Sequence, residues 1–223
     1  KETRDQIVAL IKREVVPAIG CTEPIAVALC VAKATETLGT MPESIDVLLS
    51  GNMLKNAMGV GIPGTGMSGL PIAIALGAIV GKSEYQLEVL KDSTPEHVEK
   101  GKAYIAEKRI NISLKENITE KLYIEVTVKA GDNTASAIIA GGHTHFISIT
   151  HNGEVLLSSK QKNGTQMENK DIELSLRMVY EFADTVPIEE IEFINEARRL
   201  NENASKKSLE GNYGHELGKT LSR

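Results

Sequence analysis

The sequence predicts an α+β protein in which buried small-residue helices and a glycine-rich loop precede an antiparallel β-meander, and further helices follow it. Three observations predict this class. Two stretches, Pro24–Leu38 and Leu70–Ile79, are mainly small and apolar and have the length of helices. Between Arg109 and Ser158, apolar and polar residues alternate and turn sequences interrupt them. Beyond Asp171 the apolar spacing becomes helical again.

The N-terminal helices follow from apolar spacing and from proline positions. Residues Glu2–Val16 have apolar side chains at helical spacing, and Pro17 ends or bends this helix. A break follows, and Pro24 suits the first turn of the next helix, with Thr22 or Glu23 as its cap. Because this second helix is apolar on most of its faces, we expect it to be buried.

A short β-branched strand, Ser44–Leu49, leads into the glycine-rich stretch. An amphipathic helix, Thr94–Lys108, is expected to be capped by its first threonine and to cover the meander. The strands of the meander are predicted at Arg109–Leu114, Lys121–Ala130, Thr134–Ala140, His145–His151 and Glu154–Ser158. A polar loop, Lys160–Asn169, separates the meander from two helices, Asp171–Ala183 and Pro187–Leu200, of which the first is expected to be capped by Asp171.

These elements suggest three segments. Residues 1–93 form a helical region, residues 94–160 a sheet region with one helix, and residues 161–223 a helical C-terminal segment. The last helices either stand apart or return to the first region, which would make the sheet an insertion. The chain begins without an initiator methionine and ends in GHELGKTLSR, so we expect it to belong to a longer protein.

Composition limits the classes of function. The net charge is −5 and no run of Lys or Arg occurs, which argues against a nucleic-acid or anionic-membrane surface. Pro71–Val80 is too short for a membrane span. The two cysteines in 223 residues are expected to be free thiols in a reducing compartment. The sequence therefore predicts a cytoplasmic protein.

The stretch Ser50–Gly69 combines six glycines with short polar side chains and one lysine. Glycines let a ligand approach backbone N–H groups, so this stretch suits a small anionic ligand, or else it packs tightly and binds nothing. Its GVGIPG motif does not directly follow a strand, which argues against a dinucleotide site. The candidate substrate-binding residues are Ser50, Gly51, Asn52, Asn56, Gly64 and Thr65.

Cys21 precedes a proline-started helix, where backbone N–H groups and the positive end of the helix dipole favour a thiolate. It is a candidate nucleophile or metal ligand, or alternatively a small residue buried at a tight turn. Cys30 lies inside an apolar helix and is expected to be structural. Lys55 is a candidate catalytic base if burial lowers its pKa, and His143, in a glycine turn, is a second candidate for proton transfer.

Three motifs in order resemble the L-cysteine desulfidase family, which is related to the alpha part of iron–sulfur L-serine dehydratases. They are PAIGCTEPIAVAL (17–29), SGNMLKNAMGVGIPGTG (50–66) and IALGAIVGKSEYQLEVL (74–90). The resemblance is dense over residues 14–90 and looser through AGGHTHFISI and the later helices.

The resemblance implies a lyase that eliminates a β-substituent from a small L-amino acid, giving pyruvate and ammonia, and also sulfide when the substrate is cysteine. It implies a 4Fe–4S cluster, with Cys21 matching the first cluster cysteine of the family. The other cluster cysteines of the family lie in a C-terminal part, and no cysteine follows Cys30 in this chain. The resemblance therefore implies that this chain needs that part as a partner and is inactive alone.

Two other classes of function remain open from the residues. The chain could be a non-catalytic domain that binds an amino acid or another small anion at the glycine-rich stretch. It could also be a scaffold whose buried small-residue helices form a homo-oligomer interface.

Overall fold

The computed structural model describes residues 2–159, 172–212 and 216–222. Contacts within the chain divide it into two units. The sheet unit spans Ala18–Asn163, and the helical unit combines Lys1–Pro17 with Gly164–Arg223. The first helix therefore groups with the last helices, and the sheet unit is inserted between them. The segments 1–93 and 94–160 do not separate, because both contribute to the sheet unit, and the predicted loop 160–169 lies outside the described residues.

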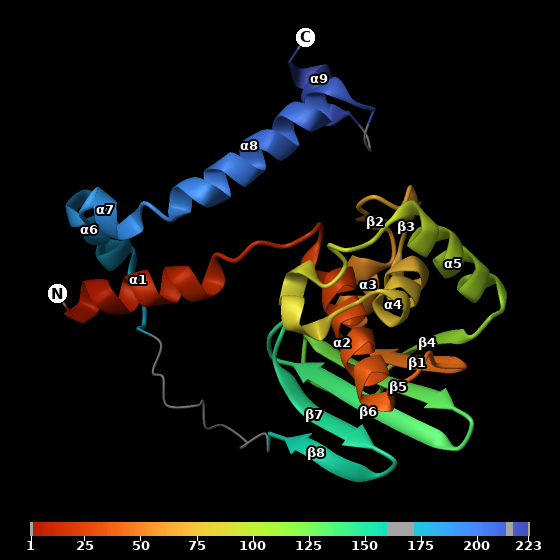
Figure 1. Cartoon of the computed structure of the whole chain (residues 1–223). Helices are drawn as coiled ribbons and strands as arrows, with labels where there is room; N and C mark the ends of the chain where they lie inside the picture. The colour runs from red at the N-terminus through yellow and green to blue at the C-terminus, as the bar shows by residue number, and fades with distance from the viewer. Residues whose placement is uncertain (1, 160–171, 213–215, 223) are drawn as a thin grey trace. The chain divides into compact units, whose positions relative to one another are not determined.

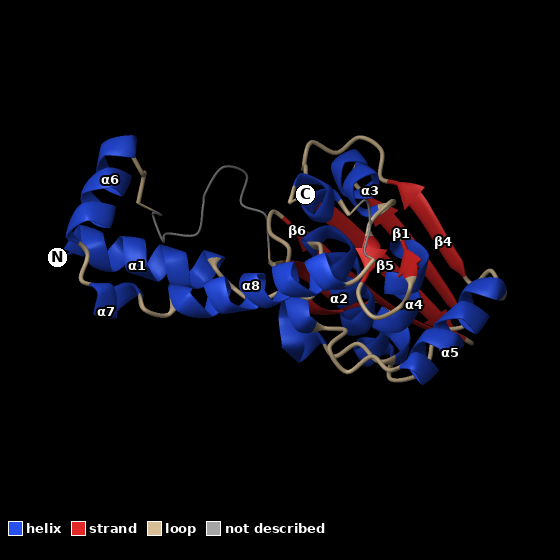
Figure 2. Ribbon diagram, turned by 90° about the horizontal axis from the view of Figure 1, so that it is seen from above, coloured by secondary structure: helices blue, strands red, loops and turns tan. Residues whose placement is uncertain are grey.

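The α+β class is confirmed: the sheet unit has a six-stranded sheet with helices on one face (Figures 1 and 2). The strand order is β4-β1-β5-β6-β7-β8. The strands are β1 (Ser44–Leu49), β4 (Ile110–Leu114), β5 (Tyr123–Ala130), β6 (Asn133–Ala140), β7 (Phe146–His151) and β8 (Glu154–Ser158). Along β5, buried Ile124, Val126 and Val128 alternate with half-buried residues, so one sheet face is apolar as expected.

The prediction of a wholly antiparallel meander is wrong at one strand. Strands β5 to β8 pair antiparallel in chain order, but β4 pairs parallel with β1, with Ile45 opposite Ile110. A parallel pair needs a long crossover connection, and here three α-helices and one short 3-10 helix lie between the two strands. Strand β1 also pairs antiparallel with β5, which joins the N-terminal region to the meander.

Two buried helices form the layer above the sheet. Helix α2 (Thr22–Leu38) packs on β5 and β6, and α4 (Leu70–Ile79) packs on α2. Their predicted burial is confirmed, since Ile25 to Val31 of α2 and Ile72 to Leu76 of α4 are fully buried. The covering helix is therefore α2 and not the predicted one, α5 (Pro95–Ala106), which packs against α4. Glycine at position 77 permits this approach, because a Cβ there would lie 2.6 Å from the Ala28 carbonyl oxygen.

The glycine-rich stretch is more regular than a loop. It contains helix α3 (Gly51–Ala57) and a small hairpin of β2 (Gly61–Ile62) and β3 (Met67–Ser68). Ser50 begins the helix as its N-cap, since its hydroxyl accepts a hydrogen bond from the Met53 N–H at 3.4 Å. In Figure 2, α3 lies beside β1, and the two elements are in contact.

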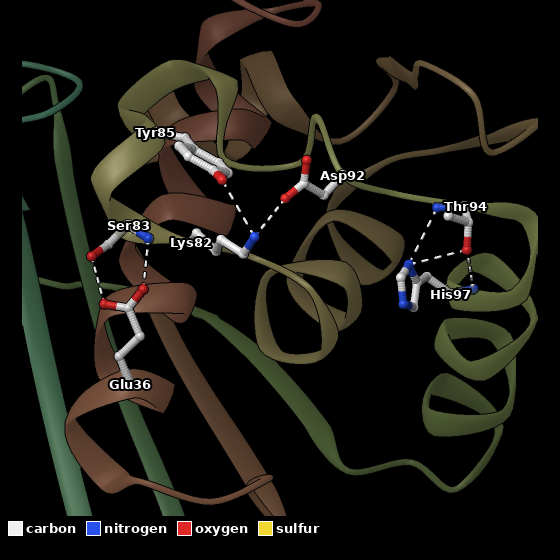
Figure 3. Close-up of polar contacts among 7 residues, drawn as sticks. All are labelled: Glu36, Lys82, Ser83, Tyr85, Asp92, Thr94 and His97. Atoms are coloured by element: carbon white, nitrogen blue, oxygen red, sulfur yellow. Dashed lines mark hydrogen bonds and ion pairs between the residues drawn. The ribbon is translucent and has the colours of Figure 1, made fainter.

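Polar contacts anchor the connection between α4 and α5 (Figure 3). It contains the short helix η1 (Ser83–Glu88), and Glu36 of α2 accepts hydrogen bonds from the Ser83 N–H at 2.7 Å and hydroxyl at 2.5 Å. Lys82 Nζ lies 2.7 Å from Asp92 Oδ2 and 3.3 Å from the Tyr85 hydroxyl. The predicted Thr cap of the next helix is confirmed as a capping box with His97. These polar contacts add to apolar packing, because Leu87, Val89 and Leu90 of the same connection are buried in the core.

The helical unit contains α1 (Glu2–Glu14), α6 (Leu176–Thr185), α7 (Ile188–Ile191), α8 (Ile194–Glu210) and α9 (Leu217–Leu221). Helix α6 is capped by Ser175, whose hydroxyl accepts from the Met178 N–H at 3.2 Å, while the predicted cap Asp171 lies outside the described residues. The predicted helix 187–200 is divided into α7 and α8, and α8 extends further than expected. Glu202 explains the extension, because Arg198 and Lys206 pair with it one turn away on either side.

Among the described residues, no helix combines the length and the apolar composition that crossing a membrane requires.

Candidate functional site

The site is built around Cys21, which is the N-cap residue of α2 and is half-buried. Its backbone is extended, and the preceding Gly20 has a φ of +84°. A Cβ at position 20 would lie 2.9 Å from Pro63 Cγ in the glycine-rich hairpin, so only glycine fits this turn. The turn that presents the Cys21 sulfur therefore lies directly against the Ser50–Gly69 stretch.

Glu23 connects the Cys21 turn to α3. Its carboxylate accepts a hydrogen bond from the Cys21 thiol, with Sγ and Oε2 2.9 Å apart, and another from the Thr22 hydroxyl at 3.3 Å. The side-chain amide of Asn56 donates to the second carboxylate oxygen at 3.4 Å. One carboxylate thus holds the start of α2 and the glycine-rich stretch together.

The charges at this site differ from the expectation for a helix N-terminus. The pKa of Cys21 is raised, first by burial and then by the hydrogen bond to Glu23 and the charge of that carboxylate. The pKa of Glu23 is lowered, first by the hydrogen bond from Cys21, with smaller contributions from Asn56 and from the charge of His143. The structure therefore does not support the predicted thiolate in the free protein, because burial of the thiol and a carboxylate two residues away together outweigh the helix dipole. Near neutral pH the site holds a thiol and an ionised carboxylate.

Of the predicted site residues, the structure brings Cys21, Asn56 and His143 together around Glu23. The turn 141–145 that contains His143 joins β6 to β7, and His143 is half-buried. Asn52 is exposed on α3, and Gly51 lies in its first turn. Gly64 is exposed in the β2–β3 turn with a φ of +76°. The backbone near Gly64 is therefore open to a ligand.

Three of the predicted roles are not supported by the geometry. Ser50 is 2% exposed, and its hydroxyl donates to the Lys121 carbonyl at 2.7 Å as well as capping α3. Thr65 is 8% exposed, and its hydroxyl donates to the Ile62 carbonyl at 2.6 Å inside the hairpin turn. Both hydroxyls are used by the fold and do not face a ligand. Lys55 is exposed, so the burial required for a catalytic base is absent.

Glu23 is the residue that sequence reasoning missed, since it was considered only as a helix cap. The signal was available in the motif GCTEP, in which an acidic residue follows a cysteine by two positions at the start of a helix. What the motif does not show is that the carboxylate also reaches Asn56, which is 33 residues away in the chain.

The residues of this chain alone do not fit a 4Fe–4S cluster, which needs three or four cysteine thiolates. Cys30 is fully buried, its thiol donates to the Ala137 carbonyl at 3.2 Å, and burial raises its pKa. In the described part of the chain, no group of three or more His, Cys, Asp or Glu residues could hold a metal ion. Cys21 can therefore supply one ligand, and the others would have to come from outside residues 1–223.

The fold and the site define an α+β protein with one half-buried thiol held by a carboxylate beside a glycine-rich hairpin. The chain is similar to UPF0597 proteins, being 67% identical over 218 residues to one from Bacteroides fragilis and 65% identical over 221 residues to one from Phocaeicola vulgatus. These alignments cover 98% and 99% of this chain but 51% of each relative. A UPF0597 protein from Photobacterium profundum is 44% identical over 217 residues, covering 96% of this chain and 50% of that protein.

The chain thus spans about half the length of the curated relatives it matches. No family model and no solved structure matches it.

The hydrogen bond between Cys21 and Glu23 leads to a test of the site electrostatics. Changing Glu23 to Gln removes a charge that raises the Cys21 pKa, so the thiolate fraction at a given pH increases. We expect Cys21 of Glu23→Gln to react several-fold faster with iodoacetamide at pH 7–8, with its pH profile moved to lower pH. The change Glu36→Gln, near the other end of α2, is the matched control and should leave the rate unchanged. An unchanged or slower rate in Glu23→Gln would contradict the assigned interaction.

Proposed function

We propose that this chain is one part of a cytoplasmic lyase that β-eliminates a small L-amino acid, in which Cys21 is one of the ligands of an iron–sulfur cluster. The proposal combines the motif resemblance to L-cysteine desulfidases with one structural observation. A half-buried thiol lies at the start of a helix, in contact with a carboxylate and next to an open glycine-rich turn. The cluster, when bound, would act as a Lewis acid towards the leaving group.

Glu23 has a defined part in this proposal. A cysteine must lose its proton to bind a metal, so metal binding releases a proton. The Glu23 carboxylate already accepts the hydrogen bond from the Cys21 thiol at 2.9 Å, and its lowered pKa keeps it ionised near neutral pH. It can therefore receive the thiol proton and pass it to solvent. The helix N-terminus then stabilises the resulting thiolate.

The overall reaction is a β-elimination. The Cα–H bond breaks and its electrons form the Cα=Cβ bond, while the Cβ–S bond of cysteine, or the Cβ–O bond of serine, breaks and releases the leaving group. The aminoacrylate product takes up water and yields pyruvate and ammonia. His143, half-buried and close enough to influence Glu23, is our candidate for proton transfer. The exposed backbone near Gly64 and the side chain of Asn52 are our candidates for contacts with the substrate.

The experiment uses the longer protein, loaded anaerobically with iron and sulfide. We expect Cys21→Ala to lose bound iron and to lose pyruvate formation from both L-cysteine and L-serine, because one ligand of the cluster is removed. Cys30→Ala is the matched control, since its sulfur lies in the core, and it should keep both properties. Full iron loading and full turnover by Cys21→Ala would remove the basis of the proposal. The relative rates on the two substrates identify the preferred leaving group.

The alternative of a non-catalytic amino-acid-binding domain has less support from the geometry. Two of its expected contacts, Ser50 and Thr65, have their hydroxyls bonded within the fold, and Glu23 adds a negative charge beside the site. Calorimetry with L-cysteine or L-serine on this chain, without iron, distinguishes the two. Binding there would favour the alternative.

A further inference from the structure

The helical unit has almost no core of its own. Across its five helices, in the part of the chain that the structure describes, Ile7 of α1 is the only buried residue. Large apolar side chains lie in solvent instead, among them Leu176 at 87%, Tyr180 at 71% and Ile188 at 71% exposed. Exposed apolar side chains of this number on one small unit mark an interaction surface.

The exposed residues of α6 are arranged on one side of the helix. Leu176, Val179 and Tyr180 are spaced three and four residues apart, and we call them the α6 stripe. On another side of the same helix, Met178 and Phe182 line a cavity of 280 Å³ together with Ile7 of α1. Helix α6 is therefore apolar on two sides, of which one already faces α1. A helix apolar on more than one side is normally enclosed by other elements.

Helix α8 is mainly polar and carries one apolar stripe. Ile194 and Leu200 are 37% and 41% exposed and are six residues apart, with half-buried Ala197 between them, and we call these three residues the α8 stripe. Its charged side chains pair among themselves, Arg199 with Glu196 and Arg198 with Glu202. Because the charged side is satisfied within the helix, the apolar stripe is the side that needs a partner.

The length of the relatives indicates what covers these stripes. The chain aligns over 98% of its own length with a B. fragilis protein of which it spans 51%, so about half of that relative has no counterpart here. We propose that the α6 and α8 stripes form the docking surface for this other half of the longer polypeptide. Covering both helices would bury the apolar side chains that the helical unit leaves in water. The proposal concerns assembly and does not depend on the lyase reaction.

The test is co-expression of this chain with the half of the B. fragilis UPF0597 protein that it does not span, without iron or substrate. We expect the two polypeptides to co-purify. Tyr180→Glu and Leu200→Glu should each weaken the complex at least about tenfold, because central apolar contacts dominate interface affinity. Leu156→Glu is the matched control: Leu156 is 56% exposed on β8 of the sheet unit, and this change should leave the affinity unchanged. Tyr180→Phe should also bind normally.

Other outcomes would overturn the proposal. The proposal is wrong if the wild-type chain does not bind the other half. It is also wrong if the stripe variants bind as tightly as Leu156→Glu. A dimer of this chain alone that the stripe variants disrupt would assign the surface to a second copy. Circular dichroism of each variant tests whether its helices form. If they do, a loss of binding is due to the changed surface side chain and not to unfolding. Since no iron or substrate is present, failure of the lyase proposal leaves this result intact.

Discussion

Replacing Gly77 with alanine is expected to destabilise the sheet unit by about 2 kcal/mol, because it forces α2 and α4 apart. The new Cβ would lie 2.6 Å from the Ala28 carbonyl oxygen and 3.1 Å from its Cα. Both atoms belong to the backbone of Ala28, a fully buried residue of α2, so neither can move aside as a flexible side chain would. Alanine favours a helix over glycine by about 1 kcal/mol, which offsets only part of the cost.

Thermal unfolding followed by circular dichroism measures this effect. For a unit of this size, a loss of about 2 kcal/mol corresponds to a fall in Tm of roughly 4–8 °C. Gly59→Ala is the matched control, since no atom lies within 4 Å of its added Cβ, and its Tm should change little. If Gly77→Ala were as stable as the wild type, the close packing of α2 on α4 would be wrong.

The two cysteines should differ in reactivity by on the order of 10³-fold or more. Cys21 is half-buried at a helix start, and a reagent can reach its sulfur in the native state. Cys30 is fully buried, and its thiol donates to the Ala137 carbonyl across the interface between α2 and the sheet. Its sulfur becomes accessible only when the sheet unit opens, which costs a large part of the free energy of unfolding. The raised pKa of Cys21 slows its reaction but does not remove this difference.

Labelling with a thiol reagent under native conditions, followed by mass spectrometry of the peptides, measures the ratio. One fast site is expected in the native protein and two in denaturant. Cys21→Ser should remove the fast site, while Cys30→Ala should retain it. Fast labelling of Cys30 in the folded protein would mean that α2 is not packed on the sheet as described.

The sequence alone predicted most of the secondary structure correctly, because the apolar residues of these helices and strands recur at clear helical or alternating spacings. The strand Ser44–Leu49 and the helix Leu70–Ile79 were predicted with the bounds observed. Each is a run of mainly apolar residues with turn residues on both sides. The motif GCTEP also predicted that a helix starts just after Cys21, but the predicted cap, Thr22 or Glu23, was wrong, because the N-cap is Cys21 itself and no side chain caps the helix. These features depend on neighbours in the chain, which the sequence displays directly.

Only the tertiary structure decided how distant segments meet. The parallel pairing of β1 with β4 joins residues 65 apart, and no local period encodes it. The hydroxyl of Ser50 donates to the Lys121 carbonyl, 71 residues away, and this use within the fold could not be predicted from the sequence. The charge state of Cys21 likewise depends on burial and on a carboxylate that Asn56 helps to hold. The propensity to form a helix or a strand depends on consecutive residues. Strand pairing, side-chain burial and pKa values depend instead on contacts between segments far apart in the chain.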